Sequence, residues 1–405
     1  MNNTVKAASL TRGKPSIWQL FILGALTAFA PISTDMYLPG LPAMSRDLNA
    51  PASIATLTVA TFFVGVALGQ LVYGPLSDRT GRRMPLQLGI LLYVAASLGC
   101  IFAPSVEALI VLRFLQGLGG CAGIVIARAI VRDRYDAQQT ASIYSLLMLV
   151  LALGPVLGPS IGALILLIAD WRTIFWVLTI FGAACGLAAF LGLEETRPAS
   201  AAVLARGESP LRSYWSLITR RRILGYTICG ALGQAALLTY VANVPDLFIG
   251  TYKITPQAFG WIFGINGIGL VAASQLNRVL LRRISYGVIL ERANVAGLAV
   301  ALVLVFDAIL GLGGIWGIAV PLFFLISNVG FIQANALAGA MAEDPSRTGS
   351  TSALFGSSQF TSGAIGAGIA AGFHDGSARP MALVILAAMI IAGVALRTLA
   401  RPNHP

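Results

Sequence analysis

The chain has 405 residues, of which 57% are hydrophobic and 11% are charged. Typical soluble domains carry about 25% charged residues, so this composition excludes a water-soluble globular protein. The formal net charge of +11 would suit a nucleic-acid-binding protein. The positions of the basic residues decide whether the charge indicates nucleic-acid binding or a membrane topology.

Apolar stretches near the roughly 20 residues that a membrane-spanning helix needs recur along the whole chain. They predict an all-α membrane protein with twelve transmembrane helices, at about 17–41, 54–73, 84–103, 106–130, 141–169, 173–193, 223–244, 257–280, 287–310, 315–341, 349–373 and 378–397. Few of these stretches contain a charged residue, as expected for spans.

The basic residues gather on one side of this predicted arrangement. All but five of the 27 Lys and Arg residues lie on that side; the five are Arg46, Arg172, Lys253 and Arg379, on the opposite side, and Arg113, within a span. The positive-inside rule then places both termini in the cytoplasm. Because the charge follows the membrane topology, nucleic acid is excluded as a partner, and the first apolar run is interpreted as an uncleaved helix.

The longest polar stretch, 194–222, divides the chain near its midpoint. It predicts an N-terminal six-helix half at 1–193, a cytoplasmic linker at 194–222 and a C-terminal six-helix half at 223–405. The segment GQLVYGPLSDRTGRR from Gly69 matches SQLNRVLLRRISYG from Ser274, with Gln70 and Gln275 at equivalent places. An offset of about half the chain indicates two pseudo-symmetric halves.

Asp35 is the acid that lies well inside a predicted span, where an ionised group costs roughly 2.5–3.5 kcal/mol and is a candidate functional residue. Arg113 lies within the fourth span. At 1.5 Å per residue, both residues sit roughly 10 Å below the outer boundary, so we expect them to pair directly or through water. Asp35 would then titrate while Arg113 tunes its affinity for protons. The alternative is a static buried ion pair.

The segment GPLSDRTGRR is predicted to form a short cytoplasmic connection between the second and third spans. Its glycines permit a tight turn, its acid can bond to a helix N-terminus or a basic residue, and its arginines can anchor at the anionic inner leaflet. The residues concerned are Gly74, Asp78, Arg79, Gly81, Arg82 and Arg83. An ordinary basic loop is the alternative.

The spacing GxLxDRxGRR between two spans resembles the major facilitator superfamily. The resemblance implies that this loop is a latch between helices that locks the outward-facing state. LRFLQGLGG, from Leu112 to Gly120, resembles the segment of that superfamily that places an arginine inside the membrane and is associated with proton coupling.

The fifth span contains ALGPVLGPSIGALI, in which Gly154, Gly158 and Gly162 recur every four residues and form one bare helix face. Such a face allows close approach of another helix, and Pro155 and Pro159 are expected to kink the helix. Generic tight packing is one interpretation. The run also resembles the motif of the antiporter branch, which implies a place at the interface of the two halves, where it restricts leakage.

The segment APISTDMYLPGLP, from Ala30 to Pro42, resembles the bicyclomycin-resistance (Bcr/CflA) branch of drug:proton antiporters. DWRTIFW from Asp170 and LEETRP from Leu193 are similar to that branch as well. Some multidrug relatives carry a second acid earlier in the first helix. Here that face reads Leu23, Thr27 and Ala30, so we expect one proton per cycle.

Polar and aromatic residues on the spans that line the cavity in this fold are candidate substrate contacts, although each alone suits helix packing. They are Tyr37, Gln116, Gln234, Tyr240, Asn243, Asn266, Asn335 and Gln359. Four single cysteines and two histidines, His374 and His404, predict no metal site, and both histidines are interpreted as surface residues. A nucleotide-binding GxxxxGK[ST] segment is absent from the sequence, so we expect no cofactor and a proton gradient as the energy source.

These features together predict a proton-coupled antiporter that exports small drug-like or metabolite molecules by alternating access. We expect it to be a multi-pass, monomeric protein of the bacterial inner membrane, whose partners are its small-molecule substrate, protons and the lipid bilayer. The alternatives are proton-coupled uptake of a nutrient and a non-transporting receptor or scaffold. An enzyme is not expected, since no span carries a nucleophile with a base or a metal-ligand cluster.

Overall fold

The computed structural model describes residues 16–135, 137–197, 210–344 and 347–400. These residues form helices joined by short connections, without a strand among them. The first group of helices is α1 (Ile17–Thr27), α2 (Phe29–Asp35), the short 3₁₀-helix η1 (Leu38–Gly40), α3 (Leu41–Asp47), α4 (Ala52–Thr80), α5 (Arg83–Ile101), α6 (Val106–Arg134), α7 (Ala137–Ile168) and α8 (Arg172–Gly192).

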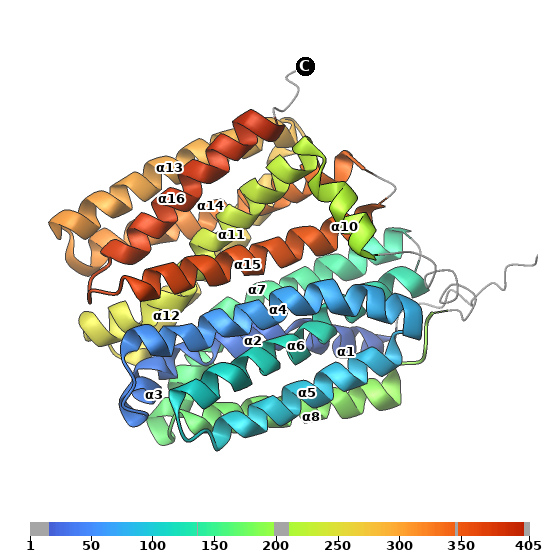
Figure 1. Ribbon diagram of the computed structural model, residues 1–405, viewed down its shortest axis with the longest axis horizontal. Helices are drawn as coiled ribbons and strands as arrows, with labels where there is room; N and C mark the ends of the chain where they lie inside the picture. The colour runs from blue at the N-terminus through green and yellow to red at the C-terminus, as the bar shows by residue number, and fades with distance from the viewer. Residues whose placement is uncertain (1–15, 136, 198–209, 345–346, 401–405) are drawn as a thin grey trace, which may run out of the picture.

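A second group follows after the helix α10 (Pro210–Ile218), which lies within the predicted linker. It consists of α11 (Arg221–Pro245), the π-helix η2 (Asp246–Thr251), α12 (Pro256–Leu280), α13 (Tyr286–Leu310), α14 (Gly314–Ala342), α15 (Thr348–Gly372), α16 (Arg379–Ala395) and the π-helix η4 (Leu396–Ala400). In Figure 1 the first group lies in the lower part of the molecule and α11 to α16 lie mostly above it.

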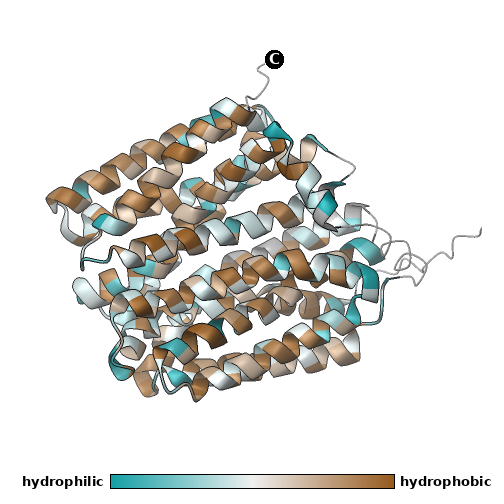
Figure 2. Ribbon diagram, viewed as in Figure 1, coloured by the Kyte–Doolittle hydropathy of each residue, from teal (hydrophilic) through white to brown (hydrophobic). Residues whose placement is uncertain are grey.

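The surface of the molecule is apolar along the helices. Within the described residues, nine helices are long and apolar enough to cross a membrane, and a tenth is added if the bent pair at the N-terminus counts as one span. The other two predicted spans, 141–169 and 349–373, lie on α7 and α15. Figure 2 shows hydrophobic residues along the helices and hydrophilic ones mostly toward their ends. Large exposed side chains such as Ile168 and Trp261 suit contact with lipid.

The first predicted span, 17–41, is not one continuous helix. It is bent by 45° between α1 and the segment that begins at Phe29, and α2 ends at Asp35. Proline explains the break, because Pro31 and Pro39 lack the N–H that a continuous helix would need at these positions. The bend places Asp35 at the end of a helix rather than in the middle of one.

The two groups of helices meet along α4 and α15, which lie side by side (Figure 1). Near the middle of this contact the rings of Phe63 and Phe360 are 6.1 Å apart between centroids. Farther along, the Gln70 side chain fills the space over Gly356, where an added Cβ would lie 1.9 Å from the Gln70 Oε1. A second contact between the groups joins α7 and α12.

Within the first group, α4 and α6 approach each other closely at two glycines. A Cβ added to Gly65 would lie 2.2 Å from the carbonyl oxygen of Phe114, and one added to Gly117 would lie 2.2 Å from the carbonyl oxygen of Phe62. Only glycine fits at such a contact, because the atoms in the way belong to the backbone of the partner helix.

We predict that Gly117→Ala lowers the midpoint of thermal unfolding of the purified protein in detergent. The added methyl group must push α4 away from α6, and such overpacking costs about 1–3 kcal/mol. Gly368→Ala in α15 is the control, because nothing lies within 4 Å of its added Cβ. An unchanged midpoint for Gly117→Ala would show that the two helices can separate freely.

Candidate functional site

Asp35 lies at the end of α2, with 5% of its surface exposed. The predicted glycine face of α7 forms the wall beside it. A Cβ added to Gly158 would lie 2.8 Å from the Asp35 Cβ, and one added to Gly154 would lie 3.7 Å from the Asp35 Oδ2. The absence of side chains at these two positions is therefore what leaves room for the carboxylate.

The same glycine face continues along the backbone that follows Asp35. A Cβ added to Gly162 would lie 2.0 Å from the Met36 carbonyl oxygen. The three glycines of the motif thus face α2 and the turn after it, within their own half of the molecule. The helix α7 continues through Pro155 and Pro159 without interruption.

The contact of α7 with the other half is made by the residues next to the glycines. A Cβ added to Gly267 of α12 would lie 3.1 Å from Val156 and 3.2 Å from Pro155, and one added to Gly260 would lie 3.3 Å from the Ser160 Cα. The motif therefore contacts α12 of the second group of helices through Pro155, Val156 and Ser160. However, its bare face is turned toward Asp35, and α12 supplies the glycines at the interface.

Arg113 of α6 is fully buried. Its Nη1 donates to the Ser33 carbonyl oxygen at 3.1 Å and to the Gln116 Oε1 at 2.5 Å. Its Nε and Nη2 have no hydrogen-bond partner in the described part of the chain. Within the described residues no ion pair or hydrogen bond joins Arg113 to Asp35, so the predicted direct pair is not formed.

Aromatic rings hold the Arg113 guanidinium in place. It lies 4.4 Å from the ring centroid of Phe62, 4.7 Å from that of Tyr37 and 5.9 Å from that of Phe175. Ring faces attract a cation and do not neutralise it as a carboxylate would. Arg113 is thus a buried positive charge enclosed by rings, and the Tyr37 that we predicted as a substrate contact forms part of this enclosure.

Most of the remaining predicted cavity residues form hydrogen bonds to neighbouring side chains or backbone. Gln116 Nε2 donates to Ser97 Oγ at 2.7 Å. In the second half, Asn266 Nδ2 donates to the Tyr240 hydroxyl at 2.7 Å, and Asn335 Nδ2 donates to Asn277 Oδ1 at 2.7 Å.

The other three predicted cavity residues lie on α11 and α15. Asn243 donates to the Thr239 carbonyl oxygen at 2.8 Å, Gln359 donates to Gln333, and Gln234 is partly buried. Of the eight predicted residues, Tyr240 has an electrostatic interaction with Asp35. This proximity brings a side chain of the second half to the carboxylate of the first.

The predicted latch is mostly helical rather than a loop, which corrects its expected boundaries. Gly74, Asp78 and Arg79 belong to α4, which continues to Thr80, and the turn is confined to Gly81 and Arg82. Gly81 has a φ of +93°, a conformation that favours glycine. Gly74 is an ordinary helical residue with open space around it, so it provides no turn.

Arg82 is the centre of this cluster, with 1% of its surface exposed. Its Nε donates to Asp133 Oδ2 at 2.7 Å, and its Nη1 lies 2.8 Å from both Asp78 Oδ1 and Ser77 Oγ. These bonds tie the ends of α4 and α6 to the start of α5. Arg83 instead donates to the Phe190 carbonyl oxygen of α8 at 2.6 Å.

Glu195, after α8, caps the N-terminus of α5 and was missed as a site residue by the sequence analysis. Its Oε1 accepts from the backbone N–H of Arg82 at 2.9 Å, and its Oε2 accepts from that of Arg83 at 3.0 Å. Partial burial raises the pKa of this carboxyl, but the backbone N–H groups outweigh that effect and hold the pKa below its ordinary value of 4.5. The segment LEETRP contained this acid, although nothing in its spacing pointed to α5.

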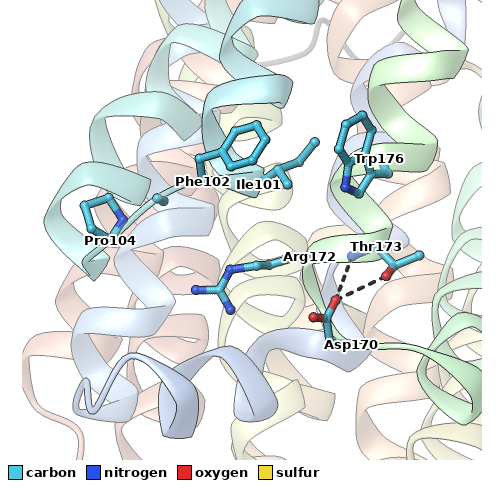
Figure 3. Close-up of a pocket in the computed structure, with 8 residues that line it drawn as sticks. Ile101, Phe102, Pro104, Asp170, Arg172, Thr173 and Trp176 are labelled. Carbon is cyan, nitrogen blue, oxygen red and sulfur yellow. Dashed lines mark hydrogen bonds between the residues drawn. The ribbon is translucent and has the colours of Figure 1, made fainter.

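A separate pocket of about 540 Å³ opens between the α5–α6 connection and the start of α8 (Figure 3). Figure 3 shows Phe102, Trp176 and Arg172 around it, with Asp170 hydrogen-bonded to Thr173. None of its lining residues belongs to the predicted site.

Comparison with known families decides what this helical arrangement is. The sequence matches the model of the Major Facilitator Superfamily over residues 23–367. The chain belongs to the Major Facilitator Superfamily. The predictions of an all-α membrane fold and of this family are thereby confirmed, and the protein is a multi-pass membrane transporter.

Several curated relatives share most of their length with this superfamily member. The chain is 32% identical over 390 residues to the uncharacterized MFS-type transporter YdgK of Bacillus subtilis, and the match covers 95% of each chain. It is 28% identical over 384 residues to the bicyclomycin resistance protein homolog of Haemophilus influenzae, covering 95% and 96% of the two chains. It is 30% identical over 341 residues to a chloramphenicol resistance protein of Pseudomonas aeruginosa, covering 83% and 79%.

Solved structures share the fold of this transporter. The xylose transporter XylE of E. coli, in a partially occluded inward-open conformation, superposes with a TM-score of 0.74 over 96% of this chain and 99% of that one, at 12% sequence identity. A D-xylose-proton symporter gives a TM-score of 0.72 at 12% identity, covering 94% and 96% of the two chains. Likeness at this identity concerns the fold alone.

We predict that Gly158→Ala abolishes transport while the protein still folds. The added methyl group would lie 2.8 Å from the Asp35 Cβ, so it must displace the carboxylate. Transport of a resistance-conferring compound into everted membrane vesicles measures the effect. Leu157→Ala is the control on the same helix, because Leu157 is exposed. Normal transport by Gly158→Ala would show that the position of Asp35 is not critical.

We also predict that Glu195→Gln destabilises the protein, whereas Glu194→Gln does not. Glu195 caps α5, while the Glu194 side chain is 81% exposed. Because the pKa of Glu195 is lowered by folding, its contribution is present above its ordinary pKa and is lost as pH falls through the lower, folded-state value. Thermal unfolding midpoints of both variants measured between neutral and acidic pH would test this. Equal midpoints at neutral pH would contradict the capping role.

Proposed function

We propose that this protein is a proton-coupled antiporter that exports small drug-like or metabolite molecules across the bacterial inner membrane by alternating access. The observation that carries the proposal is the position of Asp35, a buried carboxylate beside the interface of the two halves. A scaffold would have no need of such a group, because an ionisable residue at this depth is costly.

The relatives support export rather than uptake. Two of them are named for resistance to bicyclomycin and to chloramphenicol, and resistance by a transporter means removal of the compound from the cell. The likeness to xylose transporters concerns the fold, so it does not favour nutrient uptake. The glycine face of α7 also matches the antiporter motif that the sequence resembles.

The proposed cycle uses the two charges at the site. Asp35 is deprotonated when substrate binds from the cytoplasm, and Arg113 tunes its affinity for protons. It then accepts a proton from outside, and the loss of its negative charge favours release of the substrate. The neutral carboxyl lowers the cost of returning through a closed, drier intermediate. No cofactor takes part, and one monomer suffices.

The free energy of a proton gradient is sufficient to drive export of the substrate. One proton moving inward across about 100 mV releases about 2.3 kcal/mol, and a gradient of about one pH unit adds about 1.4 kcal/mol. Since about 1.4 kcal/mol corresponds to a tenfold concentration ratio, one proton per cycle could sustain a ratio of several hundred for a neutral substrate.

We predict that Asp35→Asn abolishes pH-driven transport in everted vesicles, because an amide cannot carry the proton. Uptake of radiolabelled chloramphenicol and of a panel of antibiotics and dyes, with and without an imposed pH gradient, measures the effect. Glu107→Gln is the control, since Glu107 is an exposed acid at the start of α6. Full pH-driven transport by Asp35→Asn would refute the proposed coupling.

Accumulation of the compound in whole cells distinguishes export from uptake. In an efflux-deficient host, cells that express the chain should accumulate less of the transported compound than cells without it, and a protonophore should abolish that difference. Greater accumulation in the expressing cells would support nutrient-type uptake instead.

A further inference from the structure

A small cavity lies at the interface of the two halves, between α4 and the outer ends of α11, α15 and α16. Its volume is about 20 Å³, and its polar lining includes Thr56, Asn243, Asp246 and His374. A water molecule needs about 10–15 Å³ of such space and two to four polar partners, so this cavity can hold one.

His374 and Asp246 form an ion pair at the edge of this cavity when the histidine is protonated. The His374 Nε2 lies 3.5 Å from the Asp246 Oδ2, and the two side chains are 32% and 21% exposed. Asp246 begins η2, and π-helical turns occur frequently at functional sites. Because η2 also contacts α3, the pair lies where the outer ends of the two halves meet.

Polar groups continue from this pair toward Asp35 along α11. Asn243 is one turn deeper than Asp246, and its Nδ2 donates to the Thr239 carbonyl oxygen. The Thr239 hydroxyl is buried without a hydrogen-bond partner among the described residues. Tyr240, at the same level, lies about 9 Å along the helix axis from Asp246.

Tyr240 carries the next hydroxyl along α11. Its hydroxyl accepts a hydrogen bond from Asn266 Nδ2, so its own proton is available to another acceptor. Asp35 lies near enough for its charge to act on this phenol. The second half therefore presents a hydroxyl to the carboxylate that the first half encloses.

We propose that His374 and Asp246 form an outer proton-loading site that supplies Asp35, a hypothesis that rests on the proposed function. External water protonates the His374 imidazole, and Asp246 stabilises the imidazolium. The proton then passes through water in the cavity and the hydroxyls of Thr239 and Tyr240 to the Asp35 carboxylate. Each hydroxyl gives one proton and receives one, so His374 and Asp35 are the groups whose protonation changes.

Other charged groups lie around the pair. Histidine changes charge most readily between about pH 5 and 8. Lys253 also acts on Asp246, and from α3 come Arg46 and Asp47, of which Asp47 is held by Arg172. The outer part of α4 contributes the uncharged Thr56.

Two further charges near the pair are engaged elsewhere. Asp375 accepts from the backbone N–H of Ser377 at 2.8 Å, and Arg379 donates to the carbonyl oxygens of Ala308 and Ile309, both at 3.3 Å.

The decisive experiment measures the rate at which Asp35 gains a proton and needs no knowledge of the substrate. The purified full chain in detergent is jumped from about pH 8 to about pH 6, and the carboxylic C=O band is followed by time-resolved infrared spectroscopy. The band that disappears in Asp35→Asn belongs to Asp35. We expect His374→Gln and Asp246→Asn each to slow its appearance about tenfold or more, with a similar final amplitude.

Controls separate this role from a structural one. Asp375→Asn removes a neighbouring exposed carboxylate and should leave the rate unchanged. The double variant His374→Gln/Asp246→Asn should be no slower than the slower single variant, because the two residues act as one site. Unchanged rates in both single variants would overturn the proton-loading site while leaving Asp35 as the coupling residue. A wild-type protein without a titrating Asp35 band would instead refute the proposed function.

Discussion

The structure depends on keeping one carboxylate buried between helices without a direct ionic partner. Asp35 ends a helix that prolines interrupt, and the glycine face of α7 leaves space for its side chain. The buried Arg113 is not its partner, because aromatic rings and a backbone carbonyl hold that guanidinium in place. A direct ion pair in this low-dielectric setting would stabilise the charged form strongly. Separation of the two groups leaves the carboxylate able to gain and lose a proton.

The helix α7 links this carboxylate to the other half of the molecule. Its glycine face touches Asp35, while the adjacent residues Pro155, Val156 and Ser160 touch the glycines of α12. Close-packed interiors transmit displacement, because their atoms have no free space to absorb it. A shift of α12 against α7 therefore changes the wall of the proton site. One helix can thus couple the protonation of Asp35 to the relative position of the two halves.

The sequence indicated the helices and the family, because hydropathy, charge and motif spacing are properties of local segments. The contacts between distant segments were not accessible in this way. Glu195 caps a helix that begins more than a hundred residues earlier, and the rings of Phe62 and Phe175 reach Arg113 from two other helices. The latch was predicted as a short connection between two spans, whereas α4 continues to Thr80 and the turn is confined to Gly81 and Arg82.

The placement of polar bonds suits alternating access by two rigid halves. Arg82 binds Asp133 and Asp78 within the first half, and in the second half Asp344 pairs with Arg220. The contacts between the halves, by contrast, are made mostly by glycines and apolar side chains along α4, α15, α7 and α12, with uncharged polar contacts at Gln70 and Gln257. Surfaces of this kind can slide or separate without leaving a buried charge unpaired, which would cost several kcal/mol. In the proposed cycle, the charge state of Asp35, a buried ionisable group beside that interface, then controls the conformational change.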